Sequence, residues 1–298
     1  MSRPAQEYIN AFARGEDFVP PAKGVFANGQ PDEAALDLLG KELETASPGV
    51  RENLVKLLVE MGRSTDPLTA KGADVLRHPR IIGLLAGPGL VRPDLGREAA
   101  IDALRKLVPQ RDLARFGAAF KDALARAPSE EVFLLVAKAK PAGARGVIDR
   151  LIVLPRWQKA EAVWIARAAL GSVADEATFM EAATGAKTGE ALARAVGPLG
   201  LMGTPRSLKL AGELLRTPLT VDIPGSMPGS IKSVRLNVLD ALLYNFPDEP
   251  SLYPNNVNRD EDYRTAERFC EKTLGVVYRT PPPPYLKYGN VPPAPLRR

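Results

Sequence analysis

The only histidine and the only cysteine of the chain, His78 and Cys270, are the residues with the most specific chemistry. A metal site or a Cys–His pair needs several such side chains, and two single residues far apart in the sequence are a poor basis for either. The sequence therefore predicts no metal ion and no cofactor. Because His78 directly precedes Pro79, we expect it to cap a helix end.

Glycine and carboxylate patterns also give no active site. Gly83, Gly87 and Gly89 form a glycine-rich stretch, but no strand pattern precedes it and no Gly-Lys-Ser/Thr follows, as phosphate binding would require. Adjacent carboxylates such as Glu130 and Glu131 fall at predicted helix starts, where negative charge complements the helix dipole. We assign no catalytic residue and favour a non-enzymatic protein over an enzyme.

The two tryptophans are the most informative aromatic residues. Trp157 and Trp164 are expected on one face of a single helix, beside Arg156, Lys159 and Arg167. Exposed indoles with basic neighbours would form a stacking platform for a nucleic acid or a partner protein. Buried indoles would fill the seam between helices, which is the more usual role of aromatics at helical spacing. These five residues are the candidate binding residues.

The elements that must position these residues are predicted to be helices. Of 298 residues, 45% are hydrophobic and 25% charged, which is enough apolar material for a folded core. Apolar residues recur at helical spacing, and the alternating pattern of strands is almost absent. Stripes over 36–46 and 50–61 flank Ser47-Pro48-Gly49, where proline ends one helix and glycine lets the chain reverse. The fold class is therefore all-α.

Similar helical pairs recur along the chain. The second helices of the pairs are expected to open near residues 49, 96, 129, 156, 187 and 230. Their mean interval of about 36 residues is close to the repeat length of helical-pair solenoids. A single pair cannot bury both of its apolar stripes, but stacked pairs bury them continuously. We expect about six to seven stacked helical hairpins.

The openings of three second helices carry a family resemblance. They read SPGVRENL at 47–54, PDLGREAA at 93–100 and IKSVRLNV at 231–238. With them the chain resembles the HEAT-repeat (armadillo-like) α-solenoids. The resemblance implies a right-handed solenoid over residues 1–277 with a concave binding surface. It also implies that Arg51, Arg97 and Arg235 are structural residues that hold adjacent repeats together.

Two segments interrupt the helical pattern. Residues 217–230 are rich in proline and glycine and are predicted to form a long loop within one helical pair. Residues 278–298 contain two proline runs and are predicted to form an extended polyproline II tail. We favour a tail that lies along the last repeat as a cap, with recruitment of an aromatic groove as the alternative.

The charge balance fits either of two partners. The chain has 40 basic and 35 acidic residues, a net charge of +5 that solubility explains as readily as a polyanion partner does. Our first hypothesis is a helical-repeat scaffold that binds a protein partner through its concave face. The alternative is a DNA-binding protein, since DNA glycosylases that excise alkylated bases resemble it in architecture. No motif of those enzymes matches, so no catalytic residue is transferred.

The sequence also bears on location. No apolar stretch reaches the length of a membrane span, and the first residues contain charged side chains where a secretory leader is apolar. A single cysteine cannot form an intramolecular disulfide. These features favour a cytoplasmic protein, with the periplasm as the alternative if a leader was removed. The identity of the partner and the oligomeric state are left open.

Overall fold

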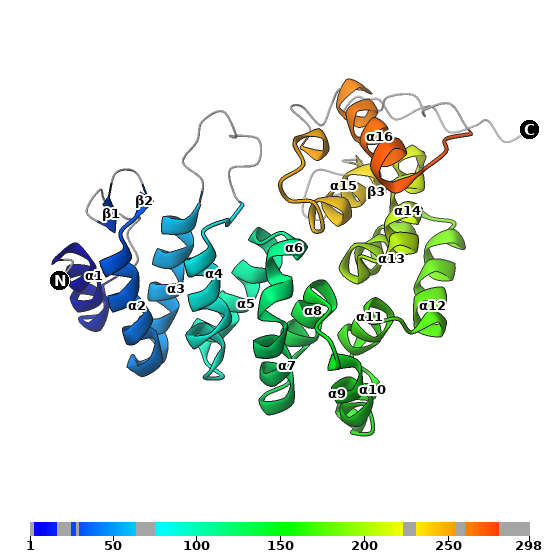
Figure 1. Cartoon of the computed structure of the whole chain (residues 1–298). Coiled ribbons are helices and arrows are strands. Elements are labelled where there is room, and N and C mark those ends of the chain that lie inside the picture. The colour runs from blue at the N-terminus through cyan, green and yellow to red at the C-terminus, as the bar shows by residue number, and fades with distance from the viewer. Residues whose placement is uncertain are drawn as a thin grey trace, which may run out of the picture. The chain divides into compact units, whose positions relative to one another are not determined.

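The protein is mostly helical, in agreement with the predicted all-α class. The computed structural model describes residues 3–16, 25–27, 30–63, 75–222, 231–253 and 260–279. The chain divides into two compact units, Met1–Leu170 (unit 1) and Gly171–Arg298 (unit 2), which are coloured along the chain in Figure 1. The single repeat domain expected over residues 1–277 stays a prediction.

Unit 1 consists of short helices in close succession. Its elements are α1 (Arg3–Ala13), β1 (Phe26–Ala27), β2 (Gln30–Pro31), α2 (Glu33–Thr45), α3 (Pro48–Gly62), α4 (Pro79–Ala86), η3 (Pro88–Leu90), α5 (Leu95–Leu107), α6 (Gln110–Leu113), η4 (Ala114–Phe116), α7 (Gly117–Arg126), α8 (Glu130–Ala139), α9 (Ala144–Leu151), α10 (Pro155–Gln158) and α11 (Glu161–Ala169). Strands β1 and β2 pair as a small antiparallel hairpin. All other elements of the unit that the structure describes are helical, apart from one isolated bridge.

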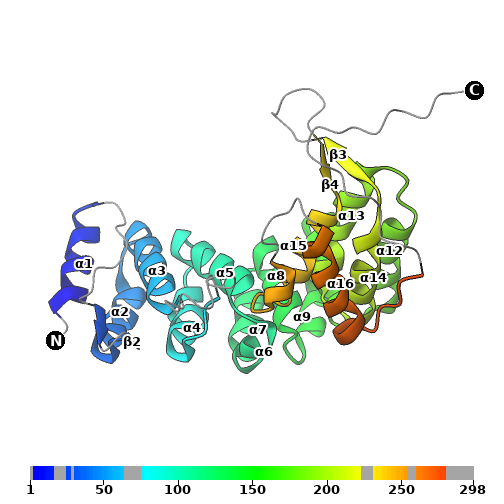
Figure 2. The same cartoon turned by 90° about the horizontal axis from the view of Figure 1, so that it is seen from above.

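The helices of unit 1 pack in two ways. Helices close in sequence pair as α2 with α3, α4 with α5, and α7 with α8, and α9 contacts α11 across the short α10. The second member of each pair also packs on the second member of the next, so that α3 contacts α5, α5 contacts α8, and α8 contacts α11 (Figures 1 and 2). Their apolar stripes meet in the core, where Leu54, Leu58, Ile101 and Leu104 are almost fully buried.

Local sequence explains where these helices begin. Pro48 starts α3 in the first turn, where its missing N–H breaks no helical bond. Asp94 caps α5, with its side chain 3.0 Å from the backbone nitrogen of Arg97. Ser129 caps α8, 3.4 Å from the backbone nitrogen of Val132. The starts of α3, α5 and α8 lie within a residue or so of the predicted openings.

Unit 2 combines helices with a second hairpin. Its elements are α12 (Val173–Thr184), α13 (Gly189–Met202), α14 (Pro205–Glu213), η5 (Leu214–Arg216), β3 (Thr220–Asp222), β4 (Ile231–Ser233), α15 (Arg235–Leu243), η6 (Pro250–Leu252) and α16 (Asp260–Leu274). Helix α13 packs on α12, α14 and α15, and α14 packs on α16. The described helices of unit 2 therefore share a core around α13 and α14.

The hairpin of unit 2 corrects one prediction. The whole of 217–230 was expected to be loop, but β3 within it pairs antiparallel with β4, with Thr220 opposite Ser233. Figure 2 shows the two strands side by side. Three-residue strands are too short to show an alternating pattern in sequence. Residues 223–230, between the strands, lie outside the described residues, as do residues 280–298 of the tail expected over 278–298.

A helix that crosses a membrane must be long and predominantly apolar. Among the helices that the structure describes, none is both long enough and apolar enough to cross a membrane.

Candidate functional site

Arg51 is a fully buried cation with one carboxylate partner and three carbonyl partners. Its Nε lies 2.8 Å from Oδ2 of Asp94, the residue that caps α5. Its Nη1 donates to the carbonyl oxygen of Leu43, and its Nη2 lies 3.3 Å from the carbonyl oxygens of Pro88 and Gly89. Burial lowers the pKa of Arg51, and the Asp94 carboxylate opposes that shift. The side chain links α2, α3 and the following helical pair, and its charge is neutralised there.

Arg97 occupies the corresponding position on α5 but has different partners. It is only 5% exposed, and its Nη2 donates to the carbonyl oxygens of Ala127 and Ala123 at 2.6 and 3.3 Å. Within the described ranges its buried Nε makes no hydrogen bond, and no carboxylate lies within ion-pair distance of its guanidinium. Burial lowers the pKa of Arg97, and the charges of Asp94 and Glu98 oppose that shift. Arg97 links two helical pairs without an ion pair to any carboxylate of the described residues.

Arg235, in unit 2, also has a carboxylate partner, which it shares with a second arginine. Its Nη2 lies 3.7 Å from Oε1 of Glu267, which is also paired with Arg216 at 2.9 Å. The guanidinium carbon stands 3.6 Å from the ring centroid of Tyr263, a cation–π contact. Of the three arginines predicted to be structural, Arg51 and Arg235 pair with acids and Arg97 does not.

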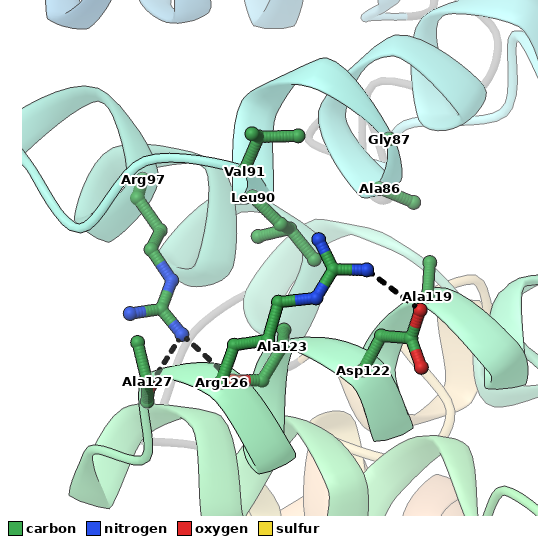
Figure 3. Close-up of a pocket in the computed structure, with 10 residues that line it drawn as sticks. All are labelled: Ala86, Gly87, Leu90, Val91, Arg97, Ala119, Asp122, Ala123, Arg126 and Ala127. Atoms are coloured by element: carbon green, nitrogen blue, oxygen red, sulfur yellow. Dashed lines mark hydrogen bonds and ion pairs between the residues drawn. The ribbon is translucent and has the colours of Figure 1, made fainter.

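A pocket of about 160 Å³ opens beside Arg97 in unit 1, and we call it the Arg97 pocket. Its lining residues come from α4, η3, the start of α5 and α7: Ala86, Gly87, Leu90, Val91, Arg97, Ala119, Asp122, Ala123, Arg126 and Ala127. Figure 3 shows Arg97 at one end and Arg126 extending from α7 toward Leu90. The pocket combines an aliphatic wall, a floor of alanines and two guanidinium groups.

The charges around this pocket do not cancel. Arg126 pairs with Asp122 one turn earlier on α7, with Nη2 and Oδ2 3.0 Å apart. Both of these side chains are well exposed, so their attraction is weakened by water. Since Asp122 is the one carboxylate among the lining residues, the pocket retains the positive charge of Arg97. An anionic group entering it would be attracted.

The outward face formed by α3, α5, α8 and α11, which we call the layer face, has a different charge pattern. Its exposed lysines pair within a helix, Lys56 with Glu52 at 2.7 Å and Lys106 with Asp102 at 2.8 Å. Its arginines pair between elements, Arg105 with Glu131 and Arg167 with Asp149. The cations of this face are therefore paired with carboxylates, in contrast to Arg97 in the pocket.

The two tryptophans lie on separate helices, which corrects the prediction of one continuous helix. Trp157 lies on α10 and Trp164 on α11. The helix breaks at Ala160, whose backbone is extended (φ −82°, ψ 112°). Trp157 is buried, 8% exposed, and its ring packs edge-on against Phe133 with centroids 5.0 Å apart. Trp164 is only partly buried, so the two indoles form no shared exposed platform.

The basic neighbours of the tryptophans are also placed. Arg156 stacks on Trp157 and Arg167 on Trp164, with guanidinium carbons 4.8 and 5.2 Å from the ring centroids. Arg167 also pairs with Asp149, 3.2 Å from its Nε, whereas Lys159 is exposed. The structure therefore brings together Arg156 with Trp157 and Arg167 with Trp164, as two separate contacts.

His78 and Cys270, the only histidine and the only cysteine, lie outside these sites. His78 stands at the first position before α4, but its side chain makes no capping hydrogen bond, which corrects the predicted capping role. Cys270 is buried in unit 2, and burial raises the pKa of its thiol to about 12. Among the residues that the structure describes, no group of three histidines, cysteines or carboxylates is arranged to hold a metal ion.

The Arg97 pocket was missed by sequence reasoning, although the sequence contains a signal for it. The residue that caps the next second helix is Asp94 for Arg51 and Ser129 for Arg97. Both residue types cap helices well, but only aspartate carries a charge that neutralises an arginine. Alignment of the repeats at their cap residues would have marked Arg97 as the exception.

Comparison of the chain with protein-family models, with curated proteins and with solved structures found no match.

Proposed function

We propose that unit 1 is a HEAT-like helical-repeat scaffold and that the protein, without catalysis of its own, binds a protein partner through the layer face. Support for the repeat arrangement comes from the packing order, in which each second helix contacts the second helix of the next pair. Further support comes from Arg51 and Arg97, each of which reaches carbonyl groups of the following pair. Such contacts between neighbours are what a stacked array requires.

The pairing of charges on the layer face is the observation that favours a protein partner. Nucleic-acid binding depends on cations that neutralise phosphates and release counterions. The cations of the layer face already have carboxylate partners, as in the pairs of Lys56 with Glu52 and Lys106 with Asp102. A surface of both signs complements another protein surface, where it contributes mainly to specificity.

Charge reversal on the layer face tests this proposal. The double variant Lys56→Glu and Lys106→Glu should reduce recovery of specific partners from a native-host lysate by about tenfold, because like charges across an interface are strongly unfavourable. The matched control is Lys41→Glu with Lys121→Glu, which changes net charge equally on α2 and α7, outside the layer face. Equal recovery by the two double variants would contradict the proposal.

The nucleic-acid alternative is tested by filter binding of duplex DNA across a range of salt concentrations. Paired cations should give weak binding with a shallow dependence on salt, because few counterions are released. Tight binding that falls steeply with ionic strength would instead favour a DNA-binding protein.

A further inference from the structure

We propose that the Arg97 pocket binds the carboxylate side chain of a glutamate or aspartate, carried by an aliphatic segment of a partner protein. This inference rests on the proposed function for the source of that segment, but it concerns a separate surface. Arg97 lies at the start of α5, which also belongs to the layer face, but the pocket opens between the α4–η3 turn and α7, and neither Lys56 nor Lys106 lines it. The two can therefore be tested independently.

The first argument is the charge of a buried guanidinium. Arginine cannot lose its proton in a protein, so Arg97 keeps a positive charge although it is only 5% exposed. A buried charge is costly unless it is paired as well as hydrogen-bonded. The two other arginines at this repeat position meet that requirement, Arg51 through Asp94 and Arg235 through Glu267. For Arg97, Asp94 and Glu98 contribute favourable electrostatics, but no carboxylate of the described residues lies within ion-pair distance of the guanidinium.

The second argument is that the difference arises at a single position. Asp94 both caps α5 and pairs with Arg51. Ser129 caps α8 in the same way but is neutral. The fold at the two turns is thus maintained by equivalent hydrogen bonds, and only the negative charge differs. An external carboxylate at the Arg97 pocket would supply what Asp94 supplies one repeat earlier.

The third argument is the shape of the pocket. A volume of about 160 Å³ is of the size of one amino-acid side chain. Ala119 and Ala123 leave room on the α7 side, and Val91 adds an exposed apolar edge, 63% accessible. A carboxylate lying between Arg97 and Arg126 would form charge-assisted hydrogen bonds, and a neighbouring aliphatic side chain would cover Val91. Figure 3 shows these groups around one opening.

Fluorescence polarisation with two labelled peptides tests the proposal. The probes are the amidated pentapeptides Ala-Leu-Glu-Leu-Ala and Ala-Leu-Gln-Leu-Ala, which differ only in the carboxylate. We expect the full-length protein to bind the glutamate peptide at least about tenfold more tightly, the size of effect that a charge-assisted pair gives. Equal affinities, or no binding of the glutamate peptide at millimolar protein, would overturn the proposal.

Variants of the pocket give the matched controls. Ser129→Asp should place a carboxylate near Arg97 and weaken binding of the glutamate peptide about tenfold, with little effect on binding of the glutamine peptide. Ala119→Leu should fill the pocket and abolish the preference, whereas Ala118→Leu, exposed on the same helix, should preserve it. Full binding by Ser129→Asp and Ala119→Leu would contradict the assignment of the site.

Two further results separate the alternatives. Free glutarate should compete weakly, because it lacks the aliphatic segment; competition as strong as that of the peptide would mean that the pocket takes a small acid, which overturns the proposal. The double variant Lys56→Glu and Lys106→Glu should bind the peptide normally. A negative peptide experiment would therefore overturn the assignment of the Arg97 pocket without affecting the proposal for the layer face. A negative partner-recovery experiment would overturn the layer-face proposal without affecting the peptide result.

Discussion

Arg51 and Arg97 mark two successive turns of unit 1 that are built alike and charged differently. Each arginine is buried on a second helix and donates to carbonyl oxygens of the following pair. At the first turn the capping residue is Asp94, which lies 2.8 Å from Arg51, and at the second it is Ser129. The comparison teaches that the arginine connects the repeats, while the capping residue determines whether its charge is neutralised internally.

Asp94→Asn should change the free energy of unfolding most, because it removes the carboxylate from the first turn and so makes that turn resemble the second. The asparagine keeps the cap but leaves Arg51 buried without a counter-charge, which should lower the free energy of unfolding by about 3 kcal/mol or more. Urea unfolding measures the change. The control is Asp122→Asn, which removes the exposed pair with Arg126 and should cost under about 1 kcal/mol. Equal losses in the two variants would show that Arg51 does not depend on Asp94.

Lys138 extends the comparison to a buried cation that can lose its proton. It is 1% exposed on α8, and its Nζ donates to the carbonyl oxygen of Arg105. Burial, and secondarily the positive charge of Arg105, lowers the pKa of Lys138 to about 7. An unfolded lysine titrates near pH 10, so between these values the unfolded state binds more protons and stability rises with pH.

Lys138→Met should therefore stabilise the protein most at pH 7 and below. The advantage over the unmodified protein should shrink by on the order of 3 kcal/mol by pH 10, where the lysine is neutral in the folded state at little cost. Urea unfolding at the two pH values measures this difference. Lys106→Met, at an exposed position of α5, serves as the control. A difference that is constant with pH would contradict the lowered pKa.

A pair of glycines tests how tightly α5 packs on α3. A Cβ added at Gly96 would lie 2.7 Å from the Cβ of Arg51, whereas one added at Gly49 would meet nothing within 4 Å. Gly96→Ala should destabilise the protein by about 1–3 kcal/mol through this clash. Gly49→Ala, inside α3, should stabilise it by about 0.5 kcal/mol. Thermal unfolding of both variants measures the contrast, and the same sign for both would contradict it.

Ser129→Asp, which makes the second turn resemble the first, should change the free energy of unfolding least. The new carboxylate should neutralise Arg97 and raise the free energy of unfolding by about 1 kcal/mol at neutral pH. Because pairing lowers the pKa of a carboxylate in the folded state, the gain should be present above its unfolded pKa and disappear as the pH falls through the folded value. Urea unfolding at several pH values measures it, with Ser129→Asn as the uncharged control. A gain of equal size in the asparagine variant would mean that capping, not charge, is responsible.

Much of the helical framework was predictable from local signals. Proline, aspartate and serine at 48, 94 and 129 fix helix starts through their own backbones and side chains, without help from distant residues. The hairpin of β3 and β4 was missed because strands of three residues show no periodicity. The break between Trp157 and Trp164 was missed because no proline or glycine marks Ala160.

The candidate site was predicted only in part. The repeat pattern identified Arg51 and Arg97 as equivalent positions, since each lies near the start of a second helix. The pocket beside Arg97 depends on the packing of α7 against η3 and α5 and on the small size of Ala119 and Ala123. These are contacts between residues far apart in sequence, and a single sequence without a structure does not specify them.

A double-mutant cycle tests the central claim most directly. Asp94→Asn is combined with Arg51→Met in one cycle and with Arg97→Met in another, and the coupling free energy is obtained from urea unfolding. Our account predicts a coupling of about 2 kcal/mol or more between Asp94 and Arg51, and a coupling under about 0.5 kcal/mol between Asp94 and Arg97. Comparable couplings in the two cycles would mean that Asp94 neutralises both arginines, and Arg97 would then have no unmatched charge to offer a partner.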